Sequence, residues 1–494
     1  MSVAAVSMFA VLWFAWRLAA SGQLLVSTAT LALGMLGVYS YASATSLAWR
    51  YLFPGVAGML VFAALPLAYT VQLGFTNYSS AHLLSETRAR SYLLEQSEVD
   101  EAHAMASTLH AEGSALRIRL ISADGSEVLL SPPISTATDA PLALAAAGDA
   151  PLGPALSLRD ALSRRDTVRA LVLKKPDGTL LHYTGVREFG PLKPLWTAGD
   201  DGALVQQPSG VVYRPNRETG YFENAQGDHI QPGFKVGIGW DNYTRMMFDA
   251  DFRGPFVSIF GWTVVFSALT VLFATLIGMT LAVLLNWEAL KYRTLYRTLL
   301  FLPYAVPGFI SILVFKGLFN QNFGEINAIL DALFGVRPAW FADPTLARAM
   351  LLIVNTWLGY PYIMVLCTGL LKAIPADLYE ASAIAGAGPL TNFFKITAPL
   401  IAKPLTPLLI SAFAFNFNNF VLIALLTDGR PDYLNTRLPA GTTDILVSYT
   451  YRIAFTDAGA NFGLAAAIST LIFIVVALMS LVNLKLTGDA KHRS

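Results

Sequence analysis

Hydrophobic residues run through this chain in eight long blocks that polar stretches separate. A helix that crosses a bilayer needs about 20 mostly apolar residues, so each block predicts one membrane-spanning helix. The first two blocks are short, and the Arg17 side chain must extend from the end of the first toward the membrane surface. The blocks cover residues 3–20, 24–42, 52–75, 256–285, 298–316, 349–371, 404–426 and 462–484.

A cleaved signal peptide is the alternative interpretation of residues 1–20, because the run Leu18–Gly22 resembles a cleavage site. Such peptides begin with a basic segment. None is present here, and Arg17 lies inside the apolar run. Both features favour a retained helix.

Residues 76–255 form a polar insert after the third block, which divides the chain into 1–75, 76–255 and 256–494. Residues 85–112 carry apolar groups at helical spacing. Further on, apolar runs interrupted by Asp-Gly predict β-hairpins. We therefore expect an α+β domain with an antiparallel sheet, inserted in an otherwise all-α polytopic membrane protein. The hairpin segments are Leu116–Ile121 with Val128–Leu130, around Asp124-Gly125, and Val168–Leu173 with Thr179–Tyr183, around Asp177-Gly178.

The composition supports a membrane protein. Of the 494 residues, 54% are hydrophobic and only 14% are charged, against about 25% charged in soluble domains. This excludes a disordered, nucleic-acid-binding or ordinary cytosolic protein. Residues 76–256 hold 22 of the 33 acidic and 17 of the 34 basic residues, as expected for a soluble domain between membrane helices.

Few features of the sequence suggest catalysis. Cys367 is the single cysteine, so an intrachain disulfide and a cysteine-based metal site are excluded. The histidines show no metal-ligand spacing, and no GxxxxGK[ST] phosphate loop occurs. The insert contains neither GxSxG nor HExxH. We expect no catalytic residues, metal or cofactor. The insert is then either a solvated spacer or, since a spacer needs no folded sheet, a docking surface for an extracytoplasmic partner.

Basic residues in short loops predict the orientation. With both termini in the cytoplasm, most of these residues face inward and the insert faces the periplasm of a bacterial inner membrane. The inward-facing set is Arg50, Lys291, Arg293, Arg297, Lys372, Lys395, Lys403, Lys485, Lys491 and Arg493.

The predicted membrane helices contain neutral polar residues and no Asp or Glu. Ion-coupled carriers commonly keep carboxylates near the membrane centre, so the pattern disfavours that class. Asn416 and Asn419 share one helix face, whereas Asn418 points elsewhere and is assigned to helix–helix contact. Asn355, Leu358, Gly359 and Tyr362 share a face of the preceding span. Amides beside aromatic rings suit a neutral sugar; interhelical hydrogen bonding is the alternative that the residues leave open.

The segment between the sixth and seventh blocks predicts a short surface helix of small residues. Pro375 can open it, Asp377 and Glu380 have the spacing of a capping box, and Gly386 and Gly388 can end it. This segment resembles the EAA loop of ABC-importer permeases, EAA-x3-G-x9-I-x-L-P. The matching residues are Glu380, Ala381, Gly386, Ile396 and Pro399, whereas Ser382 and Ala398 depart from the pattern.

The resemblance extends to the MalF-type permease subunits of maltose/maltodextrin importers. It covers residues 240–486 closely, through Leu302–Pro307, Trp357–Tyr362 and Phe415–Phe420, and 48–80 less closely. It implies a membrane subunit without ATPase activity of its own. The implied partners are a second, MalG-like permease, an ATPase homodimer and a periplasmic maltose-binding protein, which the insert helps to hold. By the same resemblance, the loop 376–399 contacts the ATPase through Glu380, Ala381, Ser382 and Gly386.

The resemblance also implies a maltose site. The matching residues are Tyr304, Asn355, Leu358, Gly359, Tyr362, Phe415, Asn416 and Asn419. Gly308 stands where the family has a serine, which leaves the exact sugar open. A permease for another neutral di- or oligosaccharide is the nearest alternative. A membrane sensor is the second alternative. It fits poorly, because the roughly ten residues after the last block leave no room for an output domain. An ion-coupled carrier is the third alternative.

Overall fold

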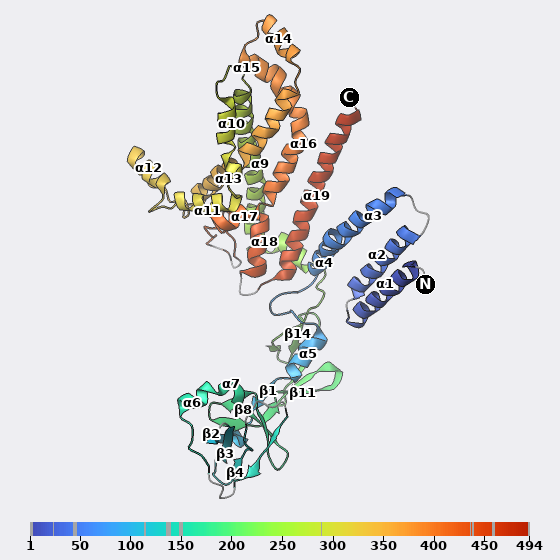
Figure 1. The fold of residues 1–494 in the computed structure, drawn as a ribbon, viewed down its shortest axis with the longest axis vertical. Helices are drawn as coiled ribbons and strands as arrows, with labels where there is room; N and C mark the ends of the chain where they lie inside the picture. The colour runs from blue at the N-terminus through green and yellow to red at the C-terminus, as the bar shows by residue number, and fades with distance from the viewer. Residues whose placement is uncertain are drawn as a thin grey trace. The chain divides into compact units, whose positions relative to one another are not determined.

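The computed structural model of the protein describes residues 3–22, 24–42, 47–112, 115–134, 140–147, 152–287, 289–434, 436, 439–456 and 460–492. The chain forms two compact units (Figure 1). The membrane unit comprises Met1–Ser80 and Gly237–Ser494, and the insert unit comprises Ala81–Val236. Residues 76–80 and 237–255, which the sequence alone assigned to the insert, therefore belong to the membrane unit.

Apolar helices dominate the membrane unit. Five helical stretches in the described residues are long and apolar enough to span a membrane: Leu47–Leu73, Phe252–Asn286, Pro344–Lys372, Pro389–Phe417 and Phe462–Lys485. Ala4–Ala20, Val26–Ala42 and Gly308–Leu318 are shorter apolar helices. All eight predicted blocks are thus confirmed as helical, although not all as single helices. The elements are α1 (Val3–Ala20), α2 (Leu24–Ala42), α3 (Leu47–Met59), η1 (Leu60–Ala64), α4 (Leu65–Leu73), α8 (Asp241–Phe248), α9 (Ala250–Asn286), α10 (Arg293–Leu300), η4 (Leu302–Tyr304), α11 (Gly308–Leu318), α12 (Glu325–Phe334), α13 (Pro344–Lys372), α14 (Ala376–Ile384), α15 (Pro389–Asn392), η5 (Phe393–Thr397), α16 (Ala398–Phe417), α17 (Phe420–Leu426), α18 (Leu446–Phe455) and α19 (Phe462–His492).

Two predicted spans are wrong as continuous helices. The block 298–316 is divided into α10, η4 and α11, because Pro303 and Pro307 lack the N–H that a helix interior requires. The block 404–426 begins earlier, in α15, and breaks after Phe417. Asn419 then caps α17 by accepting a hydrogen bond from the Leu422 N–H. Both breaks place irregular backbone at the candidate site described below.

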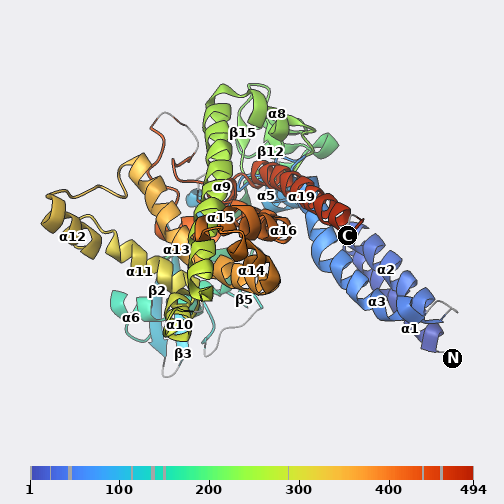
Figure 2. The same cartoon turned by 90° about the horizontal axis from the view of Figure 1, so that it is seen from above.

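The helices of the membrane unit pack lengthwise against one another. Helices α1, α2 and α3 lie side by side, as both views show (Figures 1 and 2). Helix α9 packs along α13, and α16 contacts both α9 and α19. At Gly278 of α9 the two backbones approach closely, since a Cβ there would lie 2.8 Å from the Met364 N and 2.9 Å from the Tyr360 O. Small residues allow such contacts between membrane helices.

Replacing Gly278 with leucine is expected to separate α9 from α13. Overpacking costs about 1–3 kcal/mol or more, so we expect the yield of assembled protein in membranes to fall severalfold. Gly261→Leu is the matched control, because a Cβ at this position of the same helix meets no described atom within 4 Å. Equal yields of the two variants would contradict the close packing.

The insert unit is built mainly from antiparallel strands. Its described residues form an eight-stranded sheet in the order β5-β7-β8-β9-β2-β3-β4-β6, a five-stranded sheet β11-β12-β13-β14-β15, and the pair β1-β10. Ile118, Leu120 and Phe189 are fully buried at the centre of the core beneath the larger sheet. The predicted fold class, an α+β insert in an α-helical membrane protein, is confirmed. The elements are α5 (Glu86–Leu94), β1 (Ser97–Val99), η2 (Glu101–His103), β2 (Met105–Glu112), β3 (Ala115–Ser122), β4 (Val128–Leu130), β5 (Leu142–Ala143), β6 (Ala145–Ala146), α6 (Leu158–Ser163), α7 (Arg165–Arg169), β7 (Val172–Lys174), β8 (Leu180–Gly185), β9 (Glu188–Gly190), β10 (Leu192–Pro194), β11 (Trp196–Ala198), η3 (Asp200–Gly202), β12 (Leu204–Gln206), β13 (Val212–Asn216), β14 (Tyr221–Glu223) and β15 (His229–Ile230).

Both predicted hairpins are confirmed. Strands β3 and β4 pair antiparallel, as do β7 and β8. In the first turn, hydrogen bonds from the Ser122 hydroxyl and from Ser126 lower the pKa of Asp124 to about 2. Val168 lies in α7 rather than in a strand.

The helix expected over 85–112 is wrong beyond Leu94, because residues 105–112 pair as β2 along the whole of β3.

Candidate functional site

A cavity of about 640 Å³ lies among the broken helices of the membrane unit. Its walls come from α9, α13, α16, the start of α17, and the proline-rich segment between η4 and α11. The breaks described above supply part of this wall, because Tyr304 and Asn419 both stand at helix interruptions. Non-helical backbone at membrane depth is tolerated where it lines a cavity.

Three asparagines form a hydrogen-bonded cluster on the cavity wall. The Asn355 Nδ2 donates to the Asn416 Oδ1 over 2.7 Å and to the Thr270 Oγ1 over 3.2 Å. The Asn419 Nδ2 donates to the Asn355 Oδ1 over 3.2 Å. Asn416 also donates to the Ala412 carbonyl of its own helix. The cluster therefore joins α9, α13, α16 and α17, and the Asn416 and Asn419 amides each keep one further N–H for other partners.

Aromatic rings complete the wall. Tyr304, Tyr362 and Phe415 line the cavity, with 51%, 40% and 71% of their surfaces exposed. The Tyr304 ring stacks on Phe301, with ring centres 5.2 Å apart. None of the described residues lining the cavity carries a charge. The cavity thus presents amides, hydroxyls and ring faces, which suit an uncharged polar ligand.

The structure brings all eight residues of the predicted sugar site to this one cavity. Gly308 lies there too. The set is Tyr304, Asn355, Leu358, Gly359, Tyr362, Phe415, Asn416 and Asn419. Asn418 was expected to contact a neighbouring helix. Its exposed amide instead donates to the Ala414 carbonyl of α16, the helix that Asn418 ends.

Sequence reasoning missed two polar residues of the wall, Thr270 and Ser411. Thr270 had a recognisable signal. Together with Thr263 and Ser267 it forms a polar stripe at intervals of four and three residues within an apolar helix, and all three side chains are buried. Such a stripe indicates the face that a membrane helix turns toward its neighbours.

Helix α14 is a second candidate site. None of its residues is buried, and Glu380, Ala381 and the following Gly386 are exposed. The helix ends before Gly386, whose φ is +75°. One side of the helix is hydrogen-bonded to α15 and η5, which follow it in the chain. The Tyr379 hydroxyl lies 2.9 Å from the Thr397 Oγ1, and the Ser382 hydroxyl donates to the Asn392 Oδ1. The result is a supported helix that presents small side chains outward.

The predicted capping box at this helix is wrong. The N-cap position is Pro375, which has no side-chain acceptor, so neither Asp377 nor Glu380 takes part in a reciprocal cap. Glu380 lies one turn further into the helix, with its side chain exposed. Its carboxylate is therefore not required for the local fold.

Comparisons with known proteins decide the family. The family of the maltose transport system permease protein MalF P2 domain matches residues 84–239, and that of the binding-protein-dependent transport system inner membrane component matches 274–487. The maltose/maltodextrin transport system permease protein MalF of Klebsiella aerogenes is 51% identical over 475 residues, or 95% of this chain and 92% of that protein. The chain belongs to the MalF family. It is an inner membrane component of a binding-protein-dependent transport system.

Other MalF relatives and some solved structures also match. The MalF proteins of Escherichia coli K12 and Yersinia pestis are each 50% identical, over 95% and 94% of this chain and 92% and 90% of their own lengths. A crystal structure of a bacterial alginate ABC transporter, in complex with alginate pentasaccharide-bound periplasmic protein, is 21% identical. The match covers 50% of this chain and 81% of the transporter chain, with a TM-score of 0.43.

Proposed function

We propose that this chain is the membrane-spanning subunit of an ATP-driven importer that moves maltose and maltodextrins into the cytoplasm. The uncharged cavity is the observation that carries the proposal, because its asparagine amides stand beside exposed aromatic rings. The MalF relatives, about half identical over nearly the whole chain, support the choice of sugar.

The cavity's chemistry suits a sugar. Asn416 and Asn419 offer amide N–H groups to sugar hydroxyls. Phe415, Tyr304 and Tyr362 offer ring faces to the apolar faces of sugar rings. Leu358 and Gly359 contribute an uncharged, apolar part of the cavity wall. A sugar crosses such a site unmodified, so this chain binds and releases it without covalent chemistry.

We assign the energy supply to a separate ATPase homodimer that docks on α14. Its exposed small residues allow a close approach, and Glu380, Ala381 and Gly386 match the EAA pattern, with Ser382 beside them. A MalG-like second permease completes the pathway, and a periplasmic maltose-binding protein docks on the insert unit. This arrangement requires the N- and C-termini and α14 in the cytoplasm, and the insert in the periplasm.

Co-purification tests the assembly. A tagged form of this chain is purified from its native membrane, and the accompanying subunits are identified by mass spectrometry. We expect a second permease and an ATPase, and we expect maltose with its binding protein to stimulate ATP hydrolysis. A preparation without any ATPase would contradict the proposal.

A permease for a different neutral sugar is the second candidate, and Gly308 favours it. This glycine lies on the cavity wall where the family has a serine, so one hydroxyl is missing from that face. Cells that lack their own MalF subunit separate the two candidates. Rescue of uptake with another disaccharide, but not with maltose, would favour the second.

Replacing Gly308 with serine is expected to strengthen maltose uptake. A Cβ at Gly308 meets no described atom within 4 Å, so the hydroxyl enters free space. One added hydrogen bond contributes about 0.5–1.5 kcal/mol, or roughly a two- to tenfold lower KM. Gly308→Ala is the matched control without the hydroxyl. Identical KM values for the two variants would mean that the sugar does not reach this wall.

A further inference from the structure

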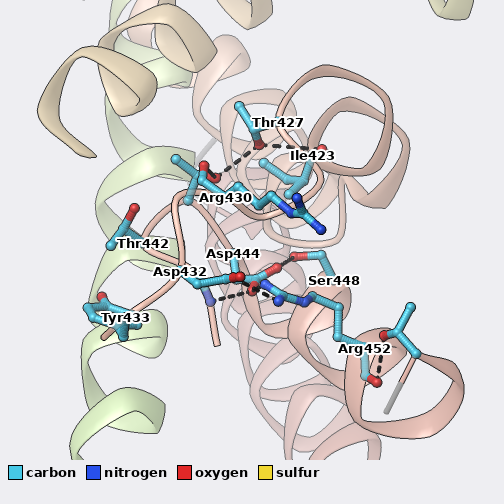
Figure 3. A network of polar contacts seen from close by, with 12 residues as sticks. Ile423, Thr427, Arg430, Asp432, Tyr433, Thr442, Asp444, Ser448 and Arg452 are labelled. Atoms are coloured by element: carbon cyan, nitrogen blue, oxygen red, sulfur yellow. Dashed lines mark hydrogen bonds and ion pairs between the residues drawn. The ribbon is translucent and has the colours of Figure 1, made fainter. Parts of the chain in front are cut away.

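The loop between α17 and α18 is built around a buried aspartate (Figure 3). Asp444 is fully buried, and its carboxylate accepts three hydrogen bonds. The donors are the Gly441 N–H and the Arg452 Nη1, both 2.8 Å from Oδ2, and the Ser448 hydroxyl, 2.8 Å from Oδ1. Arg452 also pairs with the more exposed Asp432 over 2.7 Å. A buried carboxylate with this many partners fixes the backbone around it.

Thr443, the neighbouring residue, connects the same loop to the end of α17. It is fully buried. Its Oγ1 lies 2.9 Å from the Thr427 Oγ1 and 2.7 Å from the Arg430 carbonyl. Thr427 follows the last residue of α17. Gly429 lies directly against the Asp444 carboxylate, where a Cβ would overlap its oxygens. We call Thr443 and Asp444 the loop clamp.

Further contacts fasten the loop to neighbouring helices. The Arg348 Nε, on α13, donates to the Thr442 carbonyl over 2.8 Å, and its guanidinium lies 4.9 Å from the centre of the Trp262 ring on α9. The Tyr433 hydroxyl lies 2.7 Å from the Ser258 Oγ on α9. The loop is therefore anchored to α9, α13 and α18, the first two of which also form the cavity wall.

Helix α17 connects the loop clamp to the cavity. It has seven residues, Phe420–Leu426, and Leu422, Ile423 and Leu426 are fully buried. Its N-cap is Asn419, which lines the cavity and bonds Asn355. A helix this short, about 10 Å long, moves as one piece, so a shift at its C-terminal end is carried to Asn419.

We propose that Thr443 and Asp444 are positioning residues that hold α17 so that Asn419 stays in place on the wall of the sugar cavity. The inference rests on the proposed function. The clamp residues touch no sugar themselves. Loosening them lets α17 shift and moves the Asn419 amide away from the bound sugar, which weakens sugar binding while leaving the ATPase contact at α14 unchanged.

The kinetic test uses the whole transporter in proteoliposomes with its binding protein. We expect Asp444→Asn to raise the KM for maltose about tenfold, with kcat within about twofold of the wild type. Thr443→Val, which keeps the side-chain shape but removes both hydrogen bonds, raises KM in the same direction. Asp432→Asn is the matched control, because it makes the same Asp-to-Asn change at the exposed partner of Arg452 and leaves Asp444 in place. A fall in kcat without a change in KM, or an equal effect of Asp432→Asn, would overturn the proposal.

A distance measurement tests the clamp without any sugar. Spin labels at Val421→Cys on α17 and Ile353→Cys on α13, both exposed positions, report the separation of the two helices. The native Cys367 is buried and is replaced by alanine in every sample, so that only the introduced cysteines carry a label.

We expect the distance distribution to broaden in Thr443→Val and Asp444→Asn but not in Asp432→Asn. Unchanged distributions in the clamp variants would overturn the proposal. If Asp444→Asn does not assemble, Thr443→Val decides alone. A wild type that moves no maltose would refute the proposed function and leave this distance test valid.

Discussion

Replacing Glu380 with lysine is expected to reduce ATP-driven sugar uptake about 100-fold, the upper range of typical coupling energies, without removing the protein from the membrane. Glu380 lies on exposed α14, makes no cap and is not needed for the local fold. A cation at this point disturbs the ATPase contact that the EAA pattern implies. Uptake and ATP hydrolysis are measured together in proteoliposomes, and we expect hydrolysis to lose its dependence on sugar.

Asp377→Lys is the matched control for this experiment. Asp377 lies in the first turn of the same helix, where the negative charge of an acidic side chain interacts favourably with the helix dipole and stabilises the helix. The charge change is identical and its effect on helix stability is larger. If the control reduces uptake as strongly as Glu380→Lys, helix destabilisation explains both results. Normal uptake by Glu380→Lys would remove the coupling role from this residue.

Replacing Asn416 with alanine is expected to lower sugar uptake about 10- to 100-fold at low sugar concentration, since a bound sugar hydroxyl left without its amide partner costs about 1–3 kcal/mol of binding free energy. The change removes an amide from the cavity wall and leaves Asn355 without its 2.7 Å acceptor. Assembly should persist, because Asn355 keeps Thr270 and Asn419 as partners. Uptake rates and the yield of the purified complex are measured side by side.

Asn418→Ala controls for the loss of an asparagine at the end of the same helix. Its amide is exposed and, among the described contacts, bonds only the helix that it ends. We expect near-normal uptake. If Asn416→Ala instead makes the complex fall apart, the asparagine cluster is interhelical bonding and the sugar role of Asn416 is wrong.

The cavity residues could be predicted from the sequence because helix geometry repeats. Intervals of three and four residues place Asn355, Leu358, Gly359 and Tyr362 on one face, and the structure keeps that face together on α13. Phe415 lies beside the Asn416 and Asn419 face and Tyr304 lies between Pro303 and Pro307 in the sequence, and the resemblance to a known family assigned both to the same site. Neither source indicated the helix break after Phe417, which turns Asn419 from a mid-helix residue into the cap of α17.

The insert shows where local patterns fail. Residues 105–112 carry helix-like spacing, yet they form a strand, because pairing along their whole length with β3, which starts at Ala115, outweighs that spacing. Asp-Gly turns predicted both hairpins correctly, since their signal is local. Sheet order joins strands that are far apart in sequence, such as β2 and β9, and no local pattern contains that information.

The loop clamp could not be predicted from the sequence either. Asp444 and Arg452 are eight residues apart in a segment that has the composition of an ordinary outer loop. Only the fold shows that the aspartate is fully buried and that Arg348, 94 positions before Thr442 in the chain, donates to the Thr442 carbonyl. Burial of a charge depends on tertiary packing, which sequence spacing does not reveal.

Uptake of radiolabelled maltose by the purified transporter in proteoliposomes tests the central claim most directly. Vesicles are loaded with ATP or left without it, and a protonophore collapses any proton gradient. We predict that uptake requires ATP and continues when the gradient is collapsed. Uptake that persists without ATP and stops with the protonophore would contradict the account, and would make the chain an ion-coupled carrier.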